Sequence, residues 1–462
     1  MPSDLSRRAF LKRASALSLA GSATPFVMNL AAMGEAAAAT ATDYKALVCV
    51  FLYGGNDYAN TLVPYDNTQY GIYQAQRPGL AYAQSALTAT ALTPSMALPN
   101  GAQYALAPEL AKLLPLFNAG NLAVLLNAGT LVQPTTKAQY QAHVSLPPKL
   151  LSHNDQQSYW QASSPEGAAS GWGGRIGDLL ESGNGTATLT CINVTGNAAF
   201  LTGQAAVQYS VTPAGPIALN ARNSLQGSAA AASLLQSLIS GGGTHEFEAA
   251  LGSIGSRALN LYSQVSAALG QAPATTTVFP TAADPQSSLG AQLQLVAKLI
   301  SVSSQLGAKR QVFFVSTGRY DTHAGLVTLH PTLLTNLADA LRAFYDTTVE
   351  LGVASQVTTF TGSDFGRALT ANNDGTDHGW GSMHFVLGGA VRGGRYYGIN
   401  PTLANGGPDD IGQGRLIPTL SVDQYAATLA SWFGVSNSDL ATVVPNIGNY
   451  AGSALGTNVG FV

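Results

Sequence analysis

Three apolar segments, far apart in the chain, each end in a glycine turn that is followed by an aspartate. The pairs are residues 46–52 with Asp57, residues 312–315 with Asp321, and residues 357–360 with Asp364. A short apolar run bounded by a turn is typical of a strand buried inside a sheet. The pattern therefore predicts three buried strands that each deliver a carboxylate at their end.

The segment between the second and third strands predicts how they are connected. Residues 331–351 open with Pro331, which suits a first helical turn, and carry Leu334, Leu337 and Leu341 at helical spacing. Strand, helix and strand in this order are typical of a right-handed crossover between parallel strands. We therefore expect an α/β fold with a mainly parallel sheet, helices on both faces and a ligand site beyond the carboxyl ends of the strands.

The remaining chain adds weaker signals of the same kind. Further strands are predicted near residues 122–129 and from His384 onwards, and helices near residues 108–118, 247–269, 289–306 and 423–433. With 46% hydrophobic residues, the chain can bury one large core. We expect a single domain over residues 41–462, with an insertion or cap at about residues 205–290.

Most histidines lie close to the aspartates. Four of the seven fall between residues 323 and 384, in a chain of which only 10% is charged. Clustered carboxylates repel one another unless a cation lies between them. A mixture of His and Asp suits Zn²⁺ or Mn²⁺, and Mg²⁺ or Ca²⁺ is the alternative. The candidate ligands are Asp57, Asp321, His323, His330, Asp364, Asp374, Asp377, His378 and His384.

The segment of residues 363–385 is rich in Gly and Asn and is interpreted as a loop that folds over the strand ends. Its glycines, Gly375, Gly379 and Gly381, are expected to adopt positive φ angles. In this interpretation Asp377 and His378 point inward, and Trp380 covers the site.

Each candidate ligand also has a structural interpretation. Asp321 or Asp364 could cap a helix that follows a strand. His330 could cap the helix that begins at Pro331, and Asp374 suits a turn.

Two residues are predicted to take part in catalysis. Ser152 lies beside His153 and Asp155, and a hydroxyl close to a metal can act as a nucleophile. A helix cap is the alternative for Ser152. Arg367 follows Asp364 by three residues and could bind an anionic group of a substrate.

The N-terminus predicts export. Arg7 and Arg8 form a twin-arginine pair, which is followed by a short apolar stretch and by small residues suited to a signal peptidase. Residues 1–40 are therefore interpreted as a Tat signal, with the Tat translocase as a transient partner. The mature protein is expected to be periplasmic or secreted, without a stable membrane span.

The composition gives no indication of a nucleic-acid or membrane partner. The net charge is −3, and no basic patch suggests nucleic acid or an anionic membrane surface. Cys49 and Cys191 lie in apolar runs and are favoured as two buried free thiols, although the compartment permits a disulfide.

Several longer motifs carry a family resemblance. In chain order they are "VFLYGGNDYANTLVPY", "LLSHNDQQSYWQ", "GRYDTH", "SDFGR" and "GTDHGWGSMHFVLGGAVRGGRYYG". With the twin-arginine signal, they resemble an exported bacterial family known as domain of unknown function 1501. That family is grouped with the alkaline-phosphatase-like superfamily of phosphatases, sulfatases and cofactor-independent phosphoglycerate mutases.

The resemblance implies an α/β sheet with a two-metal site at the strand ends. Asp57, Asp321, His323 and Asp364 match superfamily ligand positions, as does His378 together with Asp377 or His384. It thus implies a metal-dependent hydrolase of phosphate or sulfate esters, acting on a small-molecule or polymer substrate. The alternative is a non-catalytic envelope protein whose metal site serves stability or the binding of a partner or surface polymer.

Overall fold

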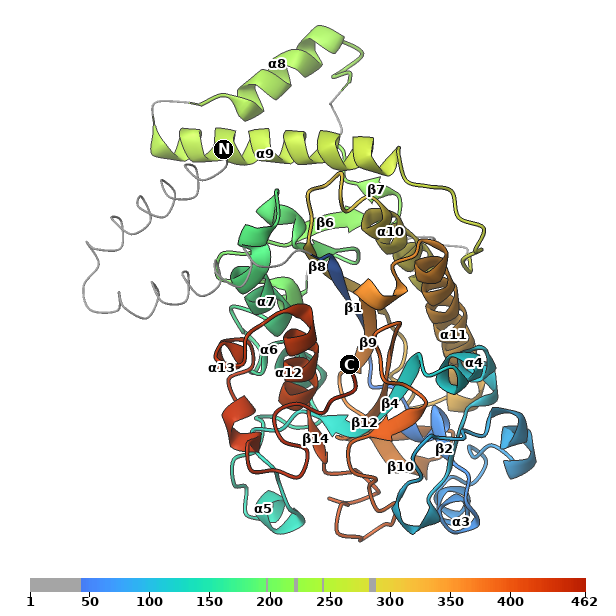
Figure 1. The fold of residues 1–462 in the computed structure, drawn as a ribbon. Coiled ribbons are helices and arrows are strands. Elements are labelled where there is room, and N and C mark those ends of the chain that lie inside the picture. Colours follow the sequence, from blue (N-terminus) through green and yellow to red (C-terminus); the bar gives the residue numbers. More distant parts are fainter. Residues whose placement is uncertain (1–42, 197, 220–222, 243–244, 282–287) are drawn as a thin grey trace.

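The computed structural model describes residues 43–462, apart from residues 197, 220–222, 243–244 and 282–287. Within this part of the chain, a ten-stranded sheet runs in the order β13-β4-β12-β9-β1-β8-β5-β6-β7, and β14 also pairs with β4 (Figure 1). The strands are β1 Lys45–Leu52, β4 Leu122–Gly129, β5 Cys191–Asn193, β6 Tyr209–Thr212, β7 Gly215–Pro216, β8 Arg310–Thr317, β9 Val357–Ser363, β12 Ser382–Gly388, β13 Arg395–Tyr397 and β14 Leu420–Ser421.

The three predicted carboxylate-bearing strands are neighbours at the centre of this sheet. β1 pairs in parallel with β8 on one side and with β9 on the other. β12 runs antiparallel to both β9 and β4. Most of the other pairings are parallel, so the prediction of a mainly parallel sheet is confirmed.

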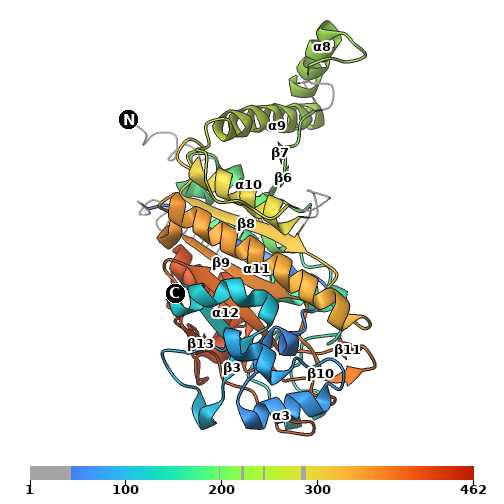
Figure 2. The same ribbon diagram turned by 90° about the vertical axis from the view of Figure 1, so that its right-hand side faces the viewer.

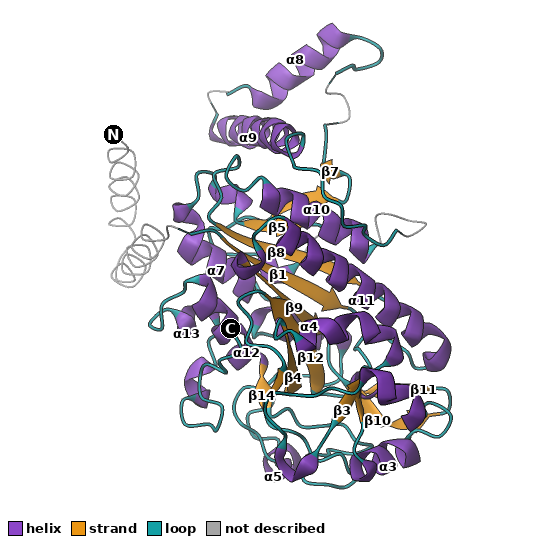
Figure 3. Cartoon of the chain, turned by 45° about the vertical axis from the view of Figure 1, so that its right-hand side comes forward, coloured by secondary structure: helices purple, strands orange, loops and turns teal. Residues whose placement is uncertain are grey.

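Helices cover both faces of the sheet (Figure 3). Alternate side chains of β1 enter two separate hydrophobic clusters, with Val48 in one and Cys49 in the other. The first cluster includes residues of α10 and α11, and the second includes residues of α7 and α12. The α-helices are α3 Asn67–Gln76, α4 Leu114–Asn118, α5 Lys137–Gln141, α6 His153–Ala162, α7 Trp172–Leu180, α8 Ala229–Ser240, α9 Glu246–Leu269, α10 Leu289–Ser301, α11 Leu326–Glu350, α12 Val422–Phe433 and α13 Leu440–Val443.

Shorter elements complete the described chain. β2 (Leu62–Pro64) pairs with β3 (Tyr104–Leu106) in a small separate sheet. The 3-10 helices are Tyr58–Asn60, Gln84–Thr90, Pro99–Gly101, Pro108–Leu113, Glu181–Gly183, Ala187–Leu189, Ala199–Leu201, Ala354–Gln356 and Ile447–Tyr450. Cys49 and Cys191 are buried and free, as favoured from the sequence. No described helix combines the length and the apolar character that a membrane crossing needs.

The crossover helix α11 begins five residues before the predicted Pro331. Gly325, with a φ of 67°, precedes it. The backbone N–H of Gly325 donates to the Asp374 carboxylate, and that of Leu326 donates to the Asp374 carbonyl. Proline was expected at the first helical position, but it lies inside the helix, because Asp374, 49 residues after Gly325, supplies the hydrogen bonds at the start of the helix.

Residues 363–385 were expected to form a loop, and this prediction was wrong. β10 (Arg367–Asn372) and β11 (Gly375–His378) form an antiparallel hairpin, with Asn373 at a φ of 55° in the turn. The glycines expected at positive φ do not adopt it. They are needed for close approach instead, since a Cβ on Gly375 would collide with the His323 backbone, and one on Gly379 with the Arg367 backbone.

Trp380 does not cover the site as expected. Its side chain packs in a small apolar cluster with Leu131, Ile417 and Tyr450, and its indole N–H donates to the Thr130 carbonyl at 2.7 Å.

The segment predicted as an insertion holds β6, β7, α8 and α9. α8 and α9 project away from the body of the fold at the end where β6 and β7 lie (Figures 1 and 2). The predicted export signal, residues 1–40, lies outside the described residues.

Candidate metal centre

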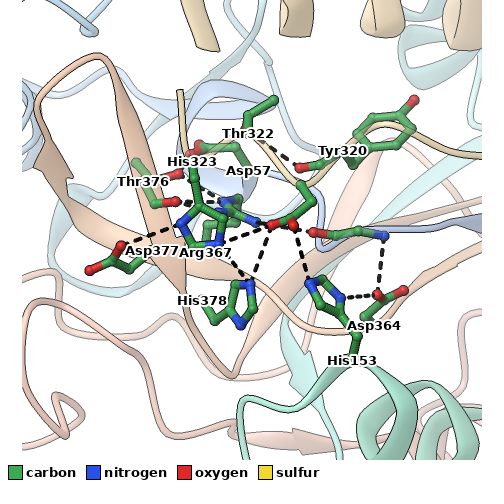
Figure 4. Close-up of polar contacts among 12 residues, drawn as sticks. Asp57, His153, Tyr320, Thr322, His323, Asp364, Arg367, Thr376, Asp377 and His378 are labelled. Atoms are coloured by element: carbon green, nitrogen blue, oxygen red, sulfur yellow. Dashed lines mark hydrogen bonds and ion pairs between the residues drawn. The ribbon is translucent and has the colours of Figure 1, made fainter. Parts of the chain in front are cut away.

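The site forms at the carboxyl ends of the central strands, where three segments meet. The chain after β8 supplies Asp321 and His323, β11 supplies His378, and the N-terminus of α6 supplies His153 (Figure 4). Because neighbouring parallel strands end at the same edge of a sheet, this edge collects side chains from distant parts of the sequence.

The Asp321 carboxylate lies at the centre of three imidazoles. The Nε2 atoms of His153, His323 and His378 lie 3.4, 3.2 and 3.3 Å from its oxygens. The Nε2 atoms of His323 and His378 are only 2.8 Å apart. One ligand atom from each of His153, Asp321 and His378 falls within 4.8 Å of the others. These three atoms are therefore the candidates to hold one ion.

The other ring nitrogen of each imidazole faces an acceptor. Nδ1 of His153 lies 2.6 Å from Asp364, and Nδ1 of His378 lies 2.8 Å from the Leu151 carbonyl. Nδ1 of His323 lies 3.5 Å from Asp377. For His153 and His378, such an acceptor favours a proton on Nδ1 and a lone pair on Nε2, which is how metal-binding histidines are oriented.

The surroundings shift the pKa values of these groups in different directions. The hydrogen bond to Asp364 raises the pKa of His153. Burial lowers the pKa of His378. Partial burial alone would raise the pKa of Asp321, but the hydrogen bond and charge of Arg367 outweigh it, so the pKa is lowered and the carboxylate stays ionised.

Arg367 is fully engaged inside the protein. Its guanidinium is buried, and it donates to Asp321 at 2.8 Å, to the Gly54 carbonyl and to Thr376. The structure therefore places Arg367 where it orients Asp321, with its donors already used by the chain.

Asp57 comes to the same edge of the sheet but lies in a separate ion pair. Both of its oxygens accept from Arg77, at 2.8 and 2.9 Å, and both residues are fully buried. Thr376 and the backbone N–H of Asn60 donate to the same carboxylate. Burial would raise the pKa of Asp57, but the charge of Arg77 lowers it overall.

His384 points away from the imidazoles. In β12, Met383 and Phe385 face one hydrophobic cluster, so His384 faces the other side of the sheet. Its neighbours there are Trp160, Tyr425 and Thr361. Burial in this setting lowers the pKa of His384 to about 3.

The other predicted residues lie at the rim. Asp364 does not face the three Nε2 atoms but holds His153, the Gly54 N–H and Gln157. Asp377 lies beside His323, Asn372 and Arg415. The Ser152 hydroxyl donates to Asp155 at 2.9 Å.

Two polar atoms at the site are buried without a hydrogen-bond partner, namely Nε2 of His153 and Oδ1 of Asp364. Such atoms are costly unless something outside the chain satisfies them. An orphaned imidazole nitrogen that faces a carboxylate and a second Nε2 fits a divalent metal ion.

The sequence matches the family model described as "Protein of unknown function (DUF1501)" over residues 44–443. The chain belongs to the DUF1501 family. No curated protein matches it.

Solved structures similar to this DUF1501 protein share little sequence with it. The PsFucS1 sulfatase from Pseudoalteromonas sp. has 11% identity and a TM-score of 0.35, over 90% of this chain and 72% of that chain. The lipoteichoic acid synthase LtaP from Listeria monocytogenes has 9% identity and a TM-score of 0.30, over 86% and 73%. The protein Ps i-CgsB, in complex with k-i-k-neocarrahexaose, has 8% identity and a TM-score of 0.36, over 88% and 77%.

His153 of this DUF1501 protein is the site residue that the sequence analysis did not assign to the metal. It was considered only as a neighbour of Ser152. A signal was present, because His153 belongs to the motif "LLSHNDQQSYWQ". Nothing in the local sequence, however, indicates that the start of α6 reaches the ends of β8 and β9.

A shallow pocket adjoins the site on the α6 side. It is lined by Tyr53, Asn154, Gln157, Ser158, Gln161, Glu166, Gly167, Ala168, Ala198 and Ala199. Gln157 links this pocket to the site, because its side-chain amide donates to Asp364 at 2.8 Å. The pocket is therefore connected through Gln157 to the carboxylate that also contacts His153.

Proposed function

We propose that the protein is an exported, metal-dependent hydrolase of phosphate or sulfate esters. The observation that supports a metal is the convergence of three imidazole Nε2 atoms on Asp321, with the rings of His153 and His378 each held by an acceptor at Nδ1. The choice of ester rests on the resemblance of its motifs to the alkaline-phosphatase-like superfamily.

The donor set favours one metal type. Two imidazoles and one carboxylate suit Zn²⁺ or Mn²⁺ better than Mg²⁺ or Ca²⁺, which prefer oxygen ligands. When bound, such an ion supplies Lewis acidity toward an ester oxygen. We assign it to one centre held by His153, Asp321 and His378. Asp57 and His384 are left out because Arg77 saturates the first and the second faces the opposite side of the sheet.

The surrounding residues have supporting roles in this proposal. Arg367 fixes the orientation of Asp321, and Asp364 fixes that of His153. The side chain of His323 is 45% exposed, so it can exchange protons with solvent and serve as the acid or base. Ser152 is retained as the proposed nucleophile, which requires its hydroxyl to leave Asp155. The Ser152→Ala variant tests this role directly.

The experiment begins with metal analysis of the protein purified from its own periplasm. The protein is then stripped with a chelator and assayed against phosphate and sulfate monoesters with and without Zn²⁺ or Mn²⁺. We expect His153→Ala and His378→Ala to lose both metal and hydrolysis. His143→Asn, a change at an exposed histidine outside the site, should lose neither. A His378→Ala variant that binds metal as tightly as the parent would overturn the assignment.

A second function is favoured by the position of His323. If its Nε2 also binds the ion, four protein ligands close a tetrahedral site, which is the arrangement of structural zinc. The protein would then be a non-catalytic metal-binding envelope protein. His323→Ala distinguishes the two functions: loss of hydrolysis with retained metal supports the enzyme, and loss of metal supports the closed site.

Export is a separate part of the proposal and has its own test. Replacing Arg7 and Arg8 by Lys should leave uncleaved precursor in the cytoplasm, because the Tat receptor reads this pair. Export of the parent chain from cells that lack Tat would contradict it.

A further inference from the structure

The surface farthest from the metal centre carries an unusual concentration of exposed apolar side chains. They lie on the hairpin of α8 and α9, which Figures 1 and 2 show projecting from the body of the fold. The exposed fractions are 81% for Phe247, 66% for Leu251 and 54% for Ile254 on α9, and 62% for Leu234 and 69% for Leu238 on α8. Large apolar side chains grouped in this way mark an interaction surface.

The hairpin is tightly packed on its inner side. Gly252 and Gly255 of α9 are buried, and a Cβ on either would collide with the backbone of residues 239–241 at the end of α8. Phe247, Leu251 and Ile254 form an exposed apolar stripe on α9. This stripe does not result from loose packing between the two helices. It lies on a different side of α9, since Phe247, Leu251 and Ile254 recur at intervals of four and three residues.

We propose that this stripe pairs with the same stripe of a second copy of the chain, with the two α9 helices antiparallel. The charges of α9 argue for this occupant. Glu246 and Glu248 lie in its first turn, and Arg257 lies eleven residues after Glu246, all exposed. Eleven residues are just over three full turns, so Glu246 and Arg257 lie on one flank of the stripe.

An antiparallel pair related by a two-fold axis brings the same flank of each helix together. With the axis near Leu251, Glu246 of each copy lies opposite Arg257 of the other. The large Phe247 then approaches the end of the partner's stripe where the small Ala258 lies. A parallel pair would instead bring opposite flanks together, so Glu246 would lose Arg257 as its partner, and the two large Phe247 side chains would meet at the same level.

The test uses the mature chain in solution. Sedimentation equilibrium from about 1 to about 100 µM, the range in which a small interface dissociates, should show a monomer–dimer equilibrium. Leu251→Asp should weaken the dimer by about tenfold or more, because it buries a charge in the stripe. Val349→Asp, a matched change at an exposed valine of α11, should leave the equilibrium unchanged.

Two further variants define the orientation. Glu246→Arg should weaken the dimer, and the combination of Glu246→Arg with Arg257→Glu should restore it. A mixture of Glu246→Cys and Arg257→Cys chains should form a disulfide-linked dimer. Neither variant should do so alone, because like positions lie about 16 Å apart along the helix. The two native cysteines are buried and do not compete.

Several results would overturn the proposal. A monomer throughout this concentration range would do so, as would a dimer that Leu251→Asp leaves intact. Efficient cross-linking of Glu246→Cys to itself would show that the helices are not antiparallel as proposed. None of these readouts depends on metal or on ester hydrolysis.

Discussion

At the scale of single residues, the site is a set of imidazoles whose orientation depends on the acceptors behind them. Asp364 is 1% exposed and holds Nδ1 of His153 at 2.6 Å, so its charge raises the basicity of Nε2 on the far side of the ring. Such carboxylates behind a metal-binding histidine commonly contribute as much to metal affinity as a weak ligand does.

We predict that Asp364→Asn weakens metal binding by about 10- to 100-fold while the protein stays folded. The amide oxygen can still accept from Nδ1, but its negative charge is lost. The measurement is a competition titration with a chromogenic chelator, together with circular dichroism. Asp374→Asn is the control, because Asp374 caps α11 and does not contact the imidazoles. Equal metal affinities of the parent and Asp364→Asn would show that Asp364 does not contribute to metal binding.

The Asp57–Arg77 pair is a second feature at this scale, and it affects stability. Both side chains have no exposed surface, so removing one leaves a buried charge without its partner. We predict that Arg77→Met lowers the free energy of unfolding by about 3–5 kcal/mol in urea titrations. The double variant Asp57→Asn with Arg77→Met should be more stable than Arg77→Met alone. If the double variant is less stable than Arg77→Met, the unpaired charge of Asp57 does not cause the loss of stability in Arg77→Met.

At the scale of elements, the β10–β11 hairpin holds one side of the site in place. Gly375 packs directly against the backbone of His323, and the Thr376 N–H donates to the Thr322 carbonyl at 3.1 Å. Arg367 adds a further bond across the hairpin to Thr376. The hairpin and the segment after β8 therefore behave as one unit, and a displacement of β11 moves both His378 and His323.

We predict that Gly375→Ala lowers both thermal stability and metal affinity, because its Cβ would push β11 away from His323. Gly71→Ala is the matched control. Gly71 lies inside α3 with open space where a Cβ would be, so alanine there should raise stability by up to about 1 kcal/mol. Thermal melts with and without chelator measure both effects. Unchanged metal affinity in Gly375→Ala would show that the two segments move independently.

At the scale of the whole molecule, burial of titratable groups sets the response to pH. His330 of α11 has no exposed surface, and its Nε2 lies 3.0 Å from the Asn56 side chain. Burial lowers its pKa from 6.5 to about 4. Asp423 acts in the opposite direction, since burial raises its pKa from 3.8 to about 6.

The direction in which His330 changes stability with pH follows from the number of protons that the folded and unfolded chains bind. Between its folded and unfolded pKa values, the unfolded chain binds more protons, so stability falls as pH falls from about 6.5 through about 4. We predict that His330→Gln, which keeps a donor toward Asn56, removes about 3 kcal/mol of this pH-dependent loss.

The measurement compares urea unfolding at neutral pH and at pH 4 for parent and variant. His143→Asn, at an exposed histidine, should follow the parent at both values. A pH profile of His330→Gln that is parallel to the parent profile would mean that His330 is protonated inside the folded protein.

Local patterns were enough to predict the central strands and the chemistry at their ends. The apolar runs before Asp57, Asp321 and Asp364 became β1, β8 and β9, side by side and parallel. This was predictable because a buried parallel strand must be apolar along its whole length, and because parallel strands end at one edge. The residue types His and Asp, read from the sequence, likewise limited the groups at this edge to imidazoles and carboxylates.

The tertiary structure alone decided which of these side chains meet. Asp57 finds Arg77, twenty residues further on, and His384 faces the opposite side of the sheet because strand side chains alternate. His153 enters from α6, 168 residues before Asp321. Contacts of this length depend on how elements pack, and a charged group takes whichever partner the packing brings near. Sequence therefore determined the sheet and the kinds of ligand, and packing selected His153, His323 and His378 around Asp321.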